Sequence, residues 1–173
     1  MSYCIARLQH LKRDGGFTLI ELVVVIAILG TLGAYAVPKL LSPAQATLPS
    51  QARTLASDLR HAQALAITWG QGLVVSASAS HYSVACRTAT ATPPCNASPV
   101  IDPATGTAFS VSLQNSASFG SPTTASLTFD SLGRPVDNSG TPLAADPAAS
   151  YTLSAGGSTQ TVTVTRLSGK VSP

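Results

Sequence analysis

The feature that most constrains this chain is a long apolar run near its N-terminus that contains a single acid. Between Phe17 and Val37, a stretch of 21 residues, Glu21 is the only charged side chain. A helix of that length spans about 30 Å, the thickness of a bilayer's hydrocarbon core. A carboxylate costs roughly 2.5–3.5 kcal/mol at the centre of an inserted helix and less near its end. The run therefore predicts a membrane helix whose acid needs a partner.

An ordinary secretory signal is the simplest alternative for such a run. A signal peptide has an apolar core of roughly 7–15 residues, followed by a small-residue cleavage site. Here the apolar run is longer, and the small residues Gly15 and Gly16 precede it. This arrangement disfavours an ordinary signal peptide.

The stretch Gly16–Glu21, with the sequence GFTLIE, resembles the processing site of type IV prepilins and of type II secretion pseudopilins. The basic leader before it and the apolar helix after it belong to the same pattern. The resemblance implies that a prepilin peptidase cleaves between Gly16 and Phe17 and that the new amino group of Phe17 is methylated. It also implies that Glu21 acts in assembly, pairing with the N-terminal amine of a neighbouring subunit. Such a pair would give the acid the partner that a low-dielectric site demands.

Charge indicates on which side of the membrane each part lies. The first 16 residues contain Arg7, Lys12 and Arg13 but only one acid, Asp14, so the rest of the chain is close to neutral. Basic residues before a membrane helix hold that end in the cytoplasm. We therefore expect a single-pass protein of the bacterial inner membrane with its globular domain in the periplasm.

The cysteines divide in the same way. Cys4 lies in the leader, whereas Cys86 and Cys95 lie in the exported part, separated by residues 87–94. In an oxidising compartment such a pair favours a disulfide over two free thiols. A metal site would need more ligands, and His81 is the one histidine nearby. We predict a Cys86–Cys95 disulfide, no metal and no cofactor.

A second helix is expected directly after the apolar run. Ser42 and Pro43 are typical of an N-cap and a first helical residue, and Pro49 and Ser50 offer a restart. Gly70 and Gly72 then end the helix. Polar residues occupy the opposite side, among them His61, which we interpret as a solvated side chain. The apolar positions follow one stripe at alternating spacings of four and three: Leu48, Ala52, Leu55, Leu59, Ala62, Ala66 and Trp69.

After Gly72 the pattern changes to the alternation of β-strands. Hairpins are predicted over 73–86 and over 151–166, where Thr and Val alternate strictly from Thr161 to Thr165. Single strands are predicted over 109–113, 125–129 and 167–171. Residues 87–106 and 137–149 are predicted loops, and 130–135 has turn chemistry.

Together these patterns predict an α+β fold. A long N-terminal helix, with a membrane half and an amphipathic half, packs on a C-terminal antiparallel β-sheet domain, as in pilins. The expected divisions are a cleaved leader over 1–16, a transmembrane helix over 17–41, an amphipathic helix over 42–70 and a periplasmic β-rich domain over 71–173.

Three short segments of the globular part, 55–64, 129–135 and 165–171, resemble the GspH/FimT group of minor pseudopilins and minor pilins. The resemblance implies a minor pseudopilin of a type II secretion system. The alternative is a minor type IV pilus subunit, of the FimT/FimU or MSHA kind, that serves pilus assembly, adhesion or DNA uptake. The implied partners are other pilin or pseudopilin subunits, the prepilin peptidase, the inner membrane and the secretion or pilus assembly platform.

DNA is the less favoured partner. Some members of the FimT group bind DNA through a C-terminal Gly-Arg pair and a second arginine. The matching place here is Gly169, Lys170, Val171 and Ser172, which keeps one cation and lacks the second arginine. The near-neutral mature chain also provides little of the positive field that phosphate binding uses.

The chain lacks the motifs of common enzymes. It has no GxxxxGK[ST] loop, no HExxH, no CxxC and no GxSxG elbow. Asp137, Asn138 and Gly140 would suit a calcium loop, but the full spaced ligand set is missing, and a plain turn is the better interpretation. We predict that the protein is not an enzyme.

Overall fold

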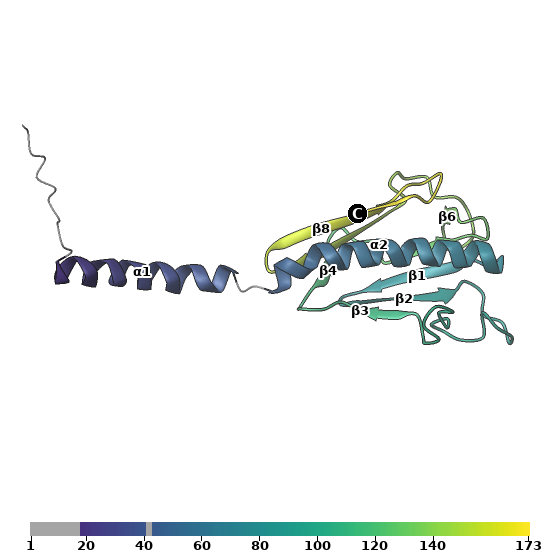
Figure 1. Cartoon of the computed structure of the whole chain (residues 1–173). Coiled ribbons are helices and arrows are strands. Elements are labelled where there is room, and N and C mark those ends of the chain that lie inside the picture. The colour runs from purple at the N-terminus through teal and green to yellow at the C-terminus, as the bar shows by residue number, and fades with distance from the viewer. Residues whose placement is uncertain (1–17, 41–42) are drawn as a thin grey trace, which may run out of the picture. The chain divides into compact units, whose positions relative to one another are not determined.

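The computed structural model describes residues 18–40 and 43–173, with side chains over 18–34 and 44–173 (Figure 1). It divides into two compact units, Met1–Leu41 and Ser42–Pro173, which are treated separately below. The predicted leader, the cleavage site between Gly16 and Phe17, and the predicted N-cap Ser42 lie outside the described residues.

The first unit contains helix α1, Leu19–Leu40. Thr18 caps it, because its Oγ1 accepts the N–H of Glu21 at 3.2 Å. The backbone is helical through Pro38. Over the part of the chain whose side chains are described, no helix combines the length and the apolar character of a membrane span.

The second unit begins with helix α2, Pro43–Trp69. Its first residue is a proline, as predicted, but the helix runs unbroken through Pro49 and does not restart there. Pro49 is exposed and lies in the second turn of the helix. After Trp69 the chain leaves the helix at Gly70, and the N–H of Gln71 bonds to the carbonyl of Ala66 at 3.2 Å. The predicted end at this glycine is confirmed.

Two antiparallel sheets complete the unit. The first has the strand order β3-β2-β1-β5-β6. Its strands are β1 (Leu73–Ser78), β2 (His81–Cys86), β3 (Ser110–Ser112), β5 (Ser126–Phe129) and β6 (Pro135–Val136). The second has the order β4-β7-β8-β9. Its strands are β4 (Ser118–Gly120), β7 (Ala149–Ala155), β8 (Ser158–Val164) and β9 (Val171–Ser172). Both predicted hairpins are present, as β1–β2 and β7–β8.

The structure differs from the prediction at the shortest strands. β4 and β6, of three and two residues, were not predicted, because neither is long enough to show an alternating pattern. The last strand was predicted over 167–171 but is β9, Val171–Ser172. The residues before it form a turn, in which the N–H of Gly169 bonds to the carbonyl of Thr165 at 3.1 Å.

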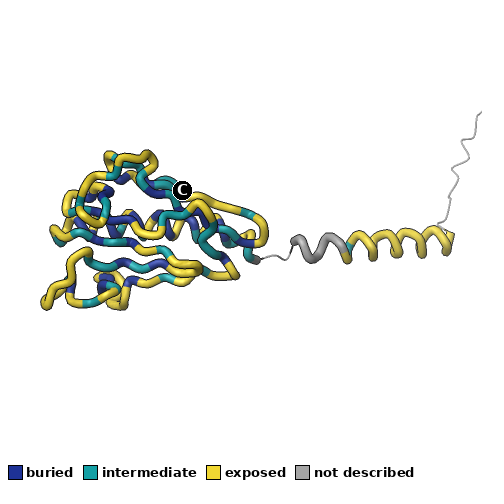
Figure 2. The backbone as a smooth tube through the Cα atoms, turned by 180° about the vertical axis from the view of Figure 1, so that it is seen from behind, coloured by how far each residue is buried: buried dark blue, intermediate teal, exposed yellow. Residues whose placement is uncertain are grey.

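The core lies between α2 and both sheets. Figure 1 shows α2 lying along the sheets, with β8 on one side and β1 on the other, and α2 contacts both strands. Figure 2 shows buried positions recurring along α2 and the strands. Burying each large apolar side chain contributes about 1.5–3 kcal/mol. The largest fully buried side chains include Leu48, Leu55, Leu59, Val75, Tyr82, Phe129, Tyr151 and Leu153.

Cys86 and Cys95 form a disulfide, with their Cα atoms 5.5 Å apart. It joins the end of β2 to the loop that follows, and the N–H of Thr90 bonds to the carbonyl of Cys95 at 2.9 Å. The predicted pairing is confirmed.

Candidate functional site

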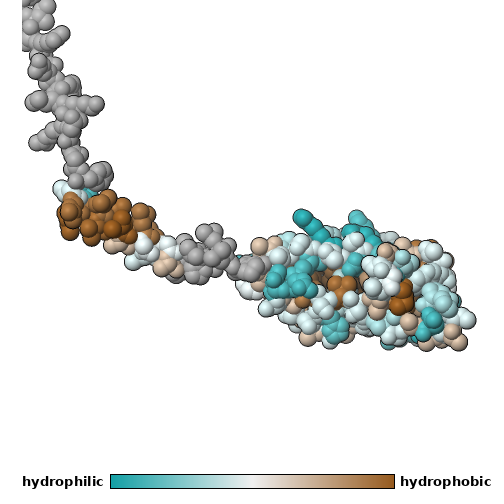
Figure 3. All heavy atoms as spheres, turned by 60° about the horizontal axis from the view of Figure 1, so that its bottom comes forward, coloured by the Kyte–Doolittle hydropathy of each residue, from teal (hydrophilic) through white to brown (hydrophobic). Residues whose placement is uncertain are grey.

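Helix α1 is apolar on all sides, and its described side chains are exposed. The exposed fraction falls from 81% at Leu19 to 42% at Val25 and is 61% at Leu32. Figure 3 shows the hydrophobic surface concentrated on the first part of α1, whereas the globular unit is mostly pale or hydrophilic. A helix that is apolar all round is normally buried all round. Helix α1 therefore requires an apolar environment that the described part of its unit does not supply.

Glu21 is the one charged residue among the described side chains of this helix, residues 19–34. It lies in the first turn and is exposed, and its carboxylate has no hydrogen-bond or ion-pair partner among the described residues. The first turn of a helix favours a negative charge, because free N–H groups point toward it. Gly16 and Phe17 lie outside the described residues, so the structure places one of the three predicted processing and assembly residues.

On the globular unit, α2 brings two of the predicted motif segments together. Nε2 of Gln63 donates to the carbonyl of Gly133 at 2.7 Å and to that of Ser168 at 3.1 Å. Gly133 and Gly169 have φ angles of 75° and 63°, which favour glycine. A Cβ on Gly169 would lie 2.8 Å from the carbonyl oxygen of Gly133. The segments 129–135 and 165–171 are thus turns packed on α2 and on each other.

Two aspartates hold turns of the same form. Oδ1 of Asp130 accepts the N–H groups of Leu132 and Arg134 at 2.9 and 2.8 Å, and the Arg134 side chain donates to Oδ2. Burial opposes ionisation of Asp130, but these hydrogen bonds outweigh it and hold its pKa below the ordinary value.

The second of these turns begins at Asp137 and is the segment whose residues would suit a calcium-binding loop. Oδ1 of Asp137 accepts the N–H groups of Ser139 and Thr141 at 2.9 and 2.8 Å. Hydrogen bonds, first from the Ser139 side chain, hold the pKa of Asp137 below the ordinary value. Across the described residues no three His, Cys, Asp or Glu side chains come together as metal ligands. The segment is a turn, as the sequence favoured.

The interpretation of His61 as a solvated side chain is wrong. Its Nε2 lies 2.9 Å from Oδ1 of Asp102, and its ring contacts that of Phe109, with centroids 5.7 Å apart. Burial opposes ionisation of Asp102, but hydrogen bonds from the Ala104 N–H and from His61 outweigh it and lower the pKa. The pair joins α2 to a loop 41 residues away, a contact that helical periodicity cannot reveal.

Asp58, another polar residue of α2, is partly buried. The hydroxyl of Tyr82 donates to its Oδ2 at 2.5 Å. Burial raises the pKa of Asp58 although this hydrogen bond lowers it, and burial with the same bond raises the pKa of Tyr82. One local signal indicates the burial of Asp58: on a helix it neighbours Leu55 and Ala62 of the buried stripe.

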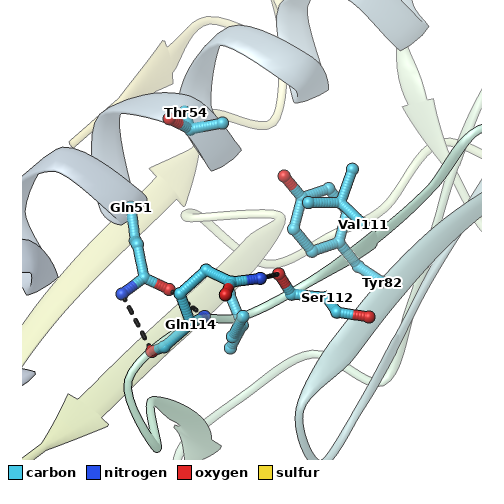
Figure 4. A pocket seen from close by; sticks show the side chains of 7 residues that line it. Gln51, Thr54, Tyr82, Val111, Ser112 and Gln114 are labelled. Atoms are coloured by element: carbon cyan, nitrogen blue, oxygen red, sulfur yellow. Dashed lines mark hydrogen bonds between the residues drawn. The ribbon is translucent and has the colours of Figure 1, made fainter.

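A shallow apolar pocket lies between α2 and the edge of β3 (Figure 4). Gln51 and Gln114 close one side of it: the N–H of Gln114 donates to Oε1 of Gln51 at 2.8 Å, and Nε2 of Gln51 donates to the Gln114 carbonyl at 3.1 Å. No charged side chain lines the pocket, and its hydroxyl groups are those of Thr54, Tyr82 and Ser112, of which that of Tyr82 donates to Asp58. The lining residues are Gln51, Thr54, Tyr82, Val111, Ser112, Leu113 and Gln114.

Comparison with known proteins gives two family matches. The family described as type II transport protein GspH matches residues 51–169, and the prokaryotic N-terminal methylation motif matches residues 11–37. A search of curated proteins found no match. Among solved structures, the type IV minor pilin FimU of Pseudomonas aeruginosa is similar, with a TM-score of 0.50 and 14% sequence identity. The similarity covers 74% of this chain and 88% of that one, and it confirms a pilin-like α+β fold.

Proposed function

Because the chain belongs to the GspH family of type II transport proteins, we propose that it is a minor pseudopilin of a type II protein secretion system. The observation that carries this proposal is the combination of the GspH-type unit with an apolar helix whose described side chains are exposed. The family is one of structural subunits, in agreement with the prediction that the chain is not an enzyme.

The proposed maturation is cleavage between Gly16 and Phe17 by the prepilin peptidase, followed by methylation of the Phe17 amine. It is supported by the match of the N-terminal methylation motif over residues 11–37. Before assembly, we place α1 in the bacterial inner membrane as a single span, with residues 43–173 in the periplasm. The basic leader residues support this orientation.

In assembly, Glu21 is proposed to pair with the Phe17 amine of a neighbouring subunit. The support is an exposed carboxylate without a partner among the described residues. Packing of α1 against the apolar helices of other subunits would cover its remaining surface. The partners are therefore other pseudopilins and the platform that extracts them from the membrane.

A minor type IV pilus subunit is the alternative. Of the three sequence segments that resemble the GspH/FimT group, 55–64 lies in α2, and 129–135 and 165–171 are turns that pack on it, so they support the fold equally in both systems. The likeness to FimU concerns the fold alone. Within the alternative, DNA binding is less favoured, because Lys170 stands where the DNA-binding members have an arginine and the second arginine is missing.

Two experiments test the proposal at different levels. Mass spectrometry of membrane-extracted protein should find a chain that begins at methylated Phe17, and replacement of Gly16 by a bulky residue should leave the leader attached. A mature chain that begins beyond Ala36 would refute any prepilin-type function.

Deletion of the gene separates the two candidate systems. We expect folded substrates to accumulate in the periplasm, because their passage across the outer membrane requires the pseudopilus. Normal secretion together with loss of surface pili would replace the proposed function by its alternative. Re-expression of the full chain is the control.

A further inference from the structure

Three exposed apolar side chains stand where the turns meet the C-terminal part of α2. Ile67, Leu132 and Leu167 are 53%, 67% and 78% exposed. Ile67 lies against Gly133, since a Cβ there would be 2.7 Å from its Cδ1. Gln63 holds the turns of Leu132 and Leu167 to the same place through its two hydrogen bonds. These three residues are called the Leu167 surface below.

Cations lie beside this surface. Arg134 and Arg166 line a depression that they share with Pro142, Leu143 and Leu167. Arg134 is paired with Asp130 at 2.8 Å. The Arg166 guanidinium donates from Nη1 to the Ala144 carbonyl at 3.3 Å, while its Nε is buried without a hydrogen-bond partner. Within the described residues no carboxylate pairs with the Arg166 side chain.

The carboxylates of the same unit are all engaged within the chain. Residues 43–173 contain five aspartates and no glutamate. Each accepts a hydrogen bond: Asp58 from Tyr82, Asp102 from Ala104, Asp130 from Leu132, Asp137 from Ser139 and Asp146 from the Arg166 N–H. The described globular unit therefore presents, beside apolar side chains, a cation that none of its own carboxylates pairs with.

We propose that the Leu167 surface docks a neighbouring subunit of a different sequence, one that presents apolar side chains next to a carboxylate. This inference rests on the proposed function, since it names a partner within the same assembly. Apolar contact would supply most of the affinity, and the pairing of a carboxylate with Arg166 would select the partner, because charge complementarity acts mainly on specificity. A second copy of this chain is disfavoured, because each of the five aspartates of its globular unit already accepts a hydrogen bond within the chain.

The test is photo-crosslinking of the full chain in intact cells. A photoreactive amino acid at Leu167 should crosslink to one other subunit of the assembly, identified by mass spectrometry. The same amino acid at Ile101, which is 47% exposed on another loop, is the matched control and should not. A crosslink from Leu167 to a second copy of this chain, to nucleic acid, or to nothing would overturn the proposal.

Charge and apolar contact are then tested separately. Arg166→Glu should lower the Leu167 crosslink about tenfold, as expected for loss of an interface hot spot. Arg53→Glu, an exposed arginine of α2, is the control and should leave it unchanged. Leu132→Asp provides a second variant, because its exposed side chain is not needed for folding, and it should lower the crosslink by a similar factor. Unchanged crosslinking in both Arg166→Glu and Leu132→Asp would refute the assigned surface.

A photoreactive residue at Ile26 of α1 separates this inference from the function on which it rests. Crosslinks from Ile26 to other subunits without any from Leu167 would refute the docking surface alone. Absence of crosslinks from both positions would refute the assembly function itself.

Discussion

Two helices of similar length distribute their apolar residues in opposite ways. Helix α1 has 22 residues and α2 has 27. Leu29 of α1 is 62% exposed, whereas Leu59 of α2 is 1% exposed. The buried apolar residues of α2 form one stripe that the two sheets cover, while the apolar residues of α1 occupy every side.

The difference shows where each helix obtains its stabilising contacts. An amphipathic stripe is matched to one partner, and α2 finds that partner in its own chain. An apolar surface on all sides is matched to lipid or to several other helices. The contacts that explain the sequence of α1 therefore lie outside this chain, whereas those that explain α2 lie within it.

The comparison predicts opposite responses to the same substitution. Leu59→Ala should lower the free energy of unfolding of the globular unit by about 2–5 kcal/mol, because it leaves a cavity in a closed core. Leu29→Ala should leave that free energy unchanged. Urea unfolding of the detergent-extracted protein, followed by Trp69 fluorescence, measures both. Equal losses of unfolding free energy in the two variants would contradict the conclusion that only α2 is stabilised by contacts within its own chain.

Two glycine substitutions test how tightly the turns pack on α2. Gly169→Ala should cost about 2–3 kcal/mol, because it adds the strain of a positive φ to a clash with Gln63 and with the Gly133 carbonyl. Gly157→Ala is the matched control: its φ is 81°, but no atom lies within 4 Å of the added Cβ, so about 1–2 kcal/mol is expected. Equal losses in the two variants would mean that the junction at Gln63 is not tightly packed.

The smallest expected effect concerns the link between α2 and the loop at Asp102. The pKa of Asp102 is lowered in the fold, so its ionised form stabilises the fold at neutral pH, and this contribution is lost as the pH falls through the lowered pKa. Asp58, whose pKa is raised, acts in the opposite direction. Asp102→Asn should cost less than about 1 kcal/mol at pH 7, because the His61 partner is partly exposed, and the cost should shrink as the pH falls below the ordinary pKa of an aspartate. A cost that does not shrink in acid would contradict this assignment.

Much of the fold could be predicted from local patterns. The stripe of α2, its end at Gly70 and both hairpins follow from periodicity and turn chemistry. The strands β4 and β6 could not be predicted, because they exist only through pairing with β7 and β5. Short strands of this kind have no sequence period of their own.

The candidate site was predictable to a different degree. Glu21 could be identified because a lone acid in an apolar run is a local signal. The Leu167 surface could not, since Ile67, Leu132 and Leu167 become neighbours only when Gln63 joins two turns that are distant in the sequence. The partners of His61 and Asp58 were missed for the same reason.

The central claim is that α1 is stabilised by other subunits and that Glu21 directs this packing. Glu21→Val tests it most directly, with crosslinking from Ile26 as the readout. Thr31→Val is the matched control, because it also removes a polar group from α1, one that bonds to its own helix at Ile28.

We predict that the Glu21→Val chain is cleaved and inserted normally, accumulates in the inner membrane and fails to crosslink. Loss of the Glu21 carboxylate would lower the free-energy cost of keeping α1 in the bilayer and would leave the Phe17 amine of a neighbouring subunit unpaired. The Thr31→Val chain should crosslink like the unaltered protein. Normal crosslinking by Glu21→Val would contradict the account, because the lone acid in the apolar run of α1 would then have no part in assembly.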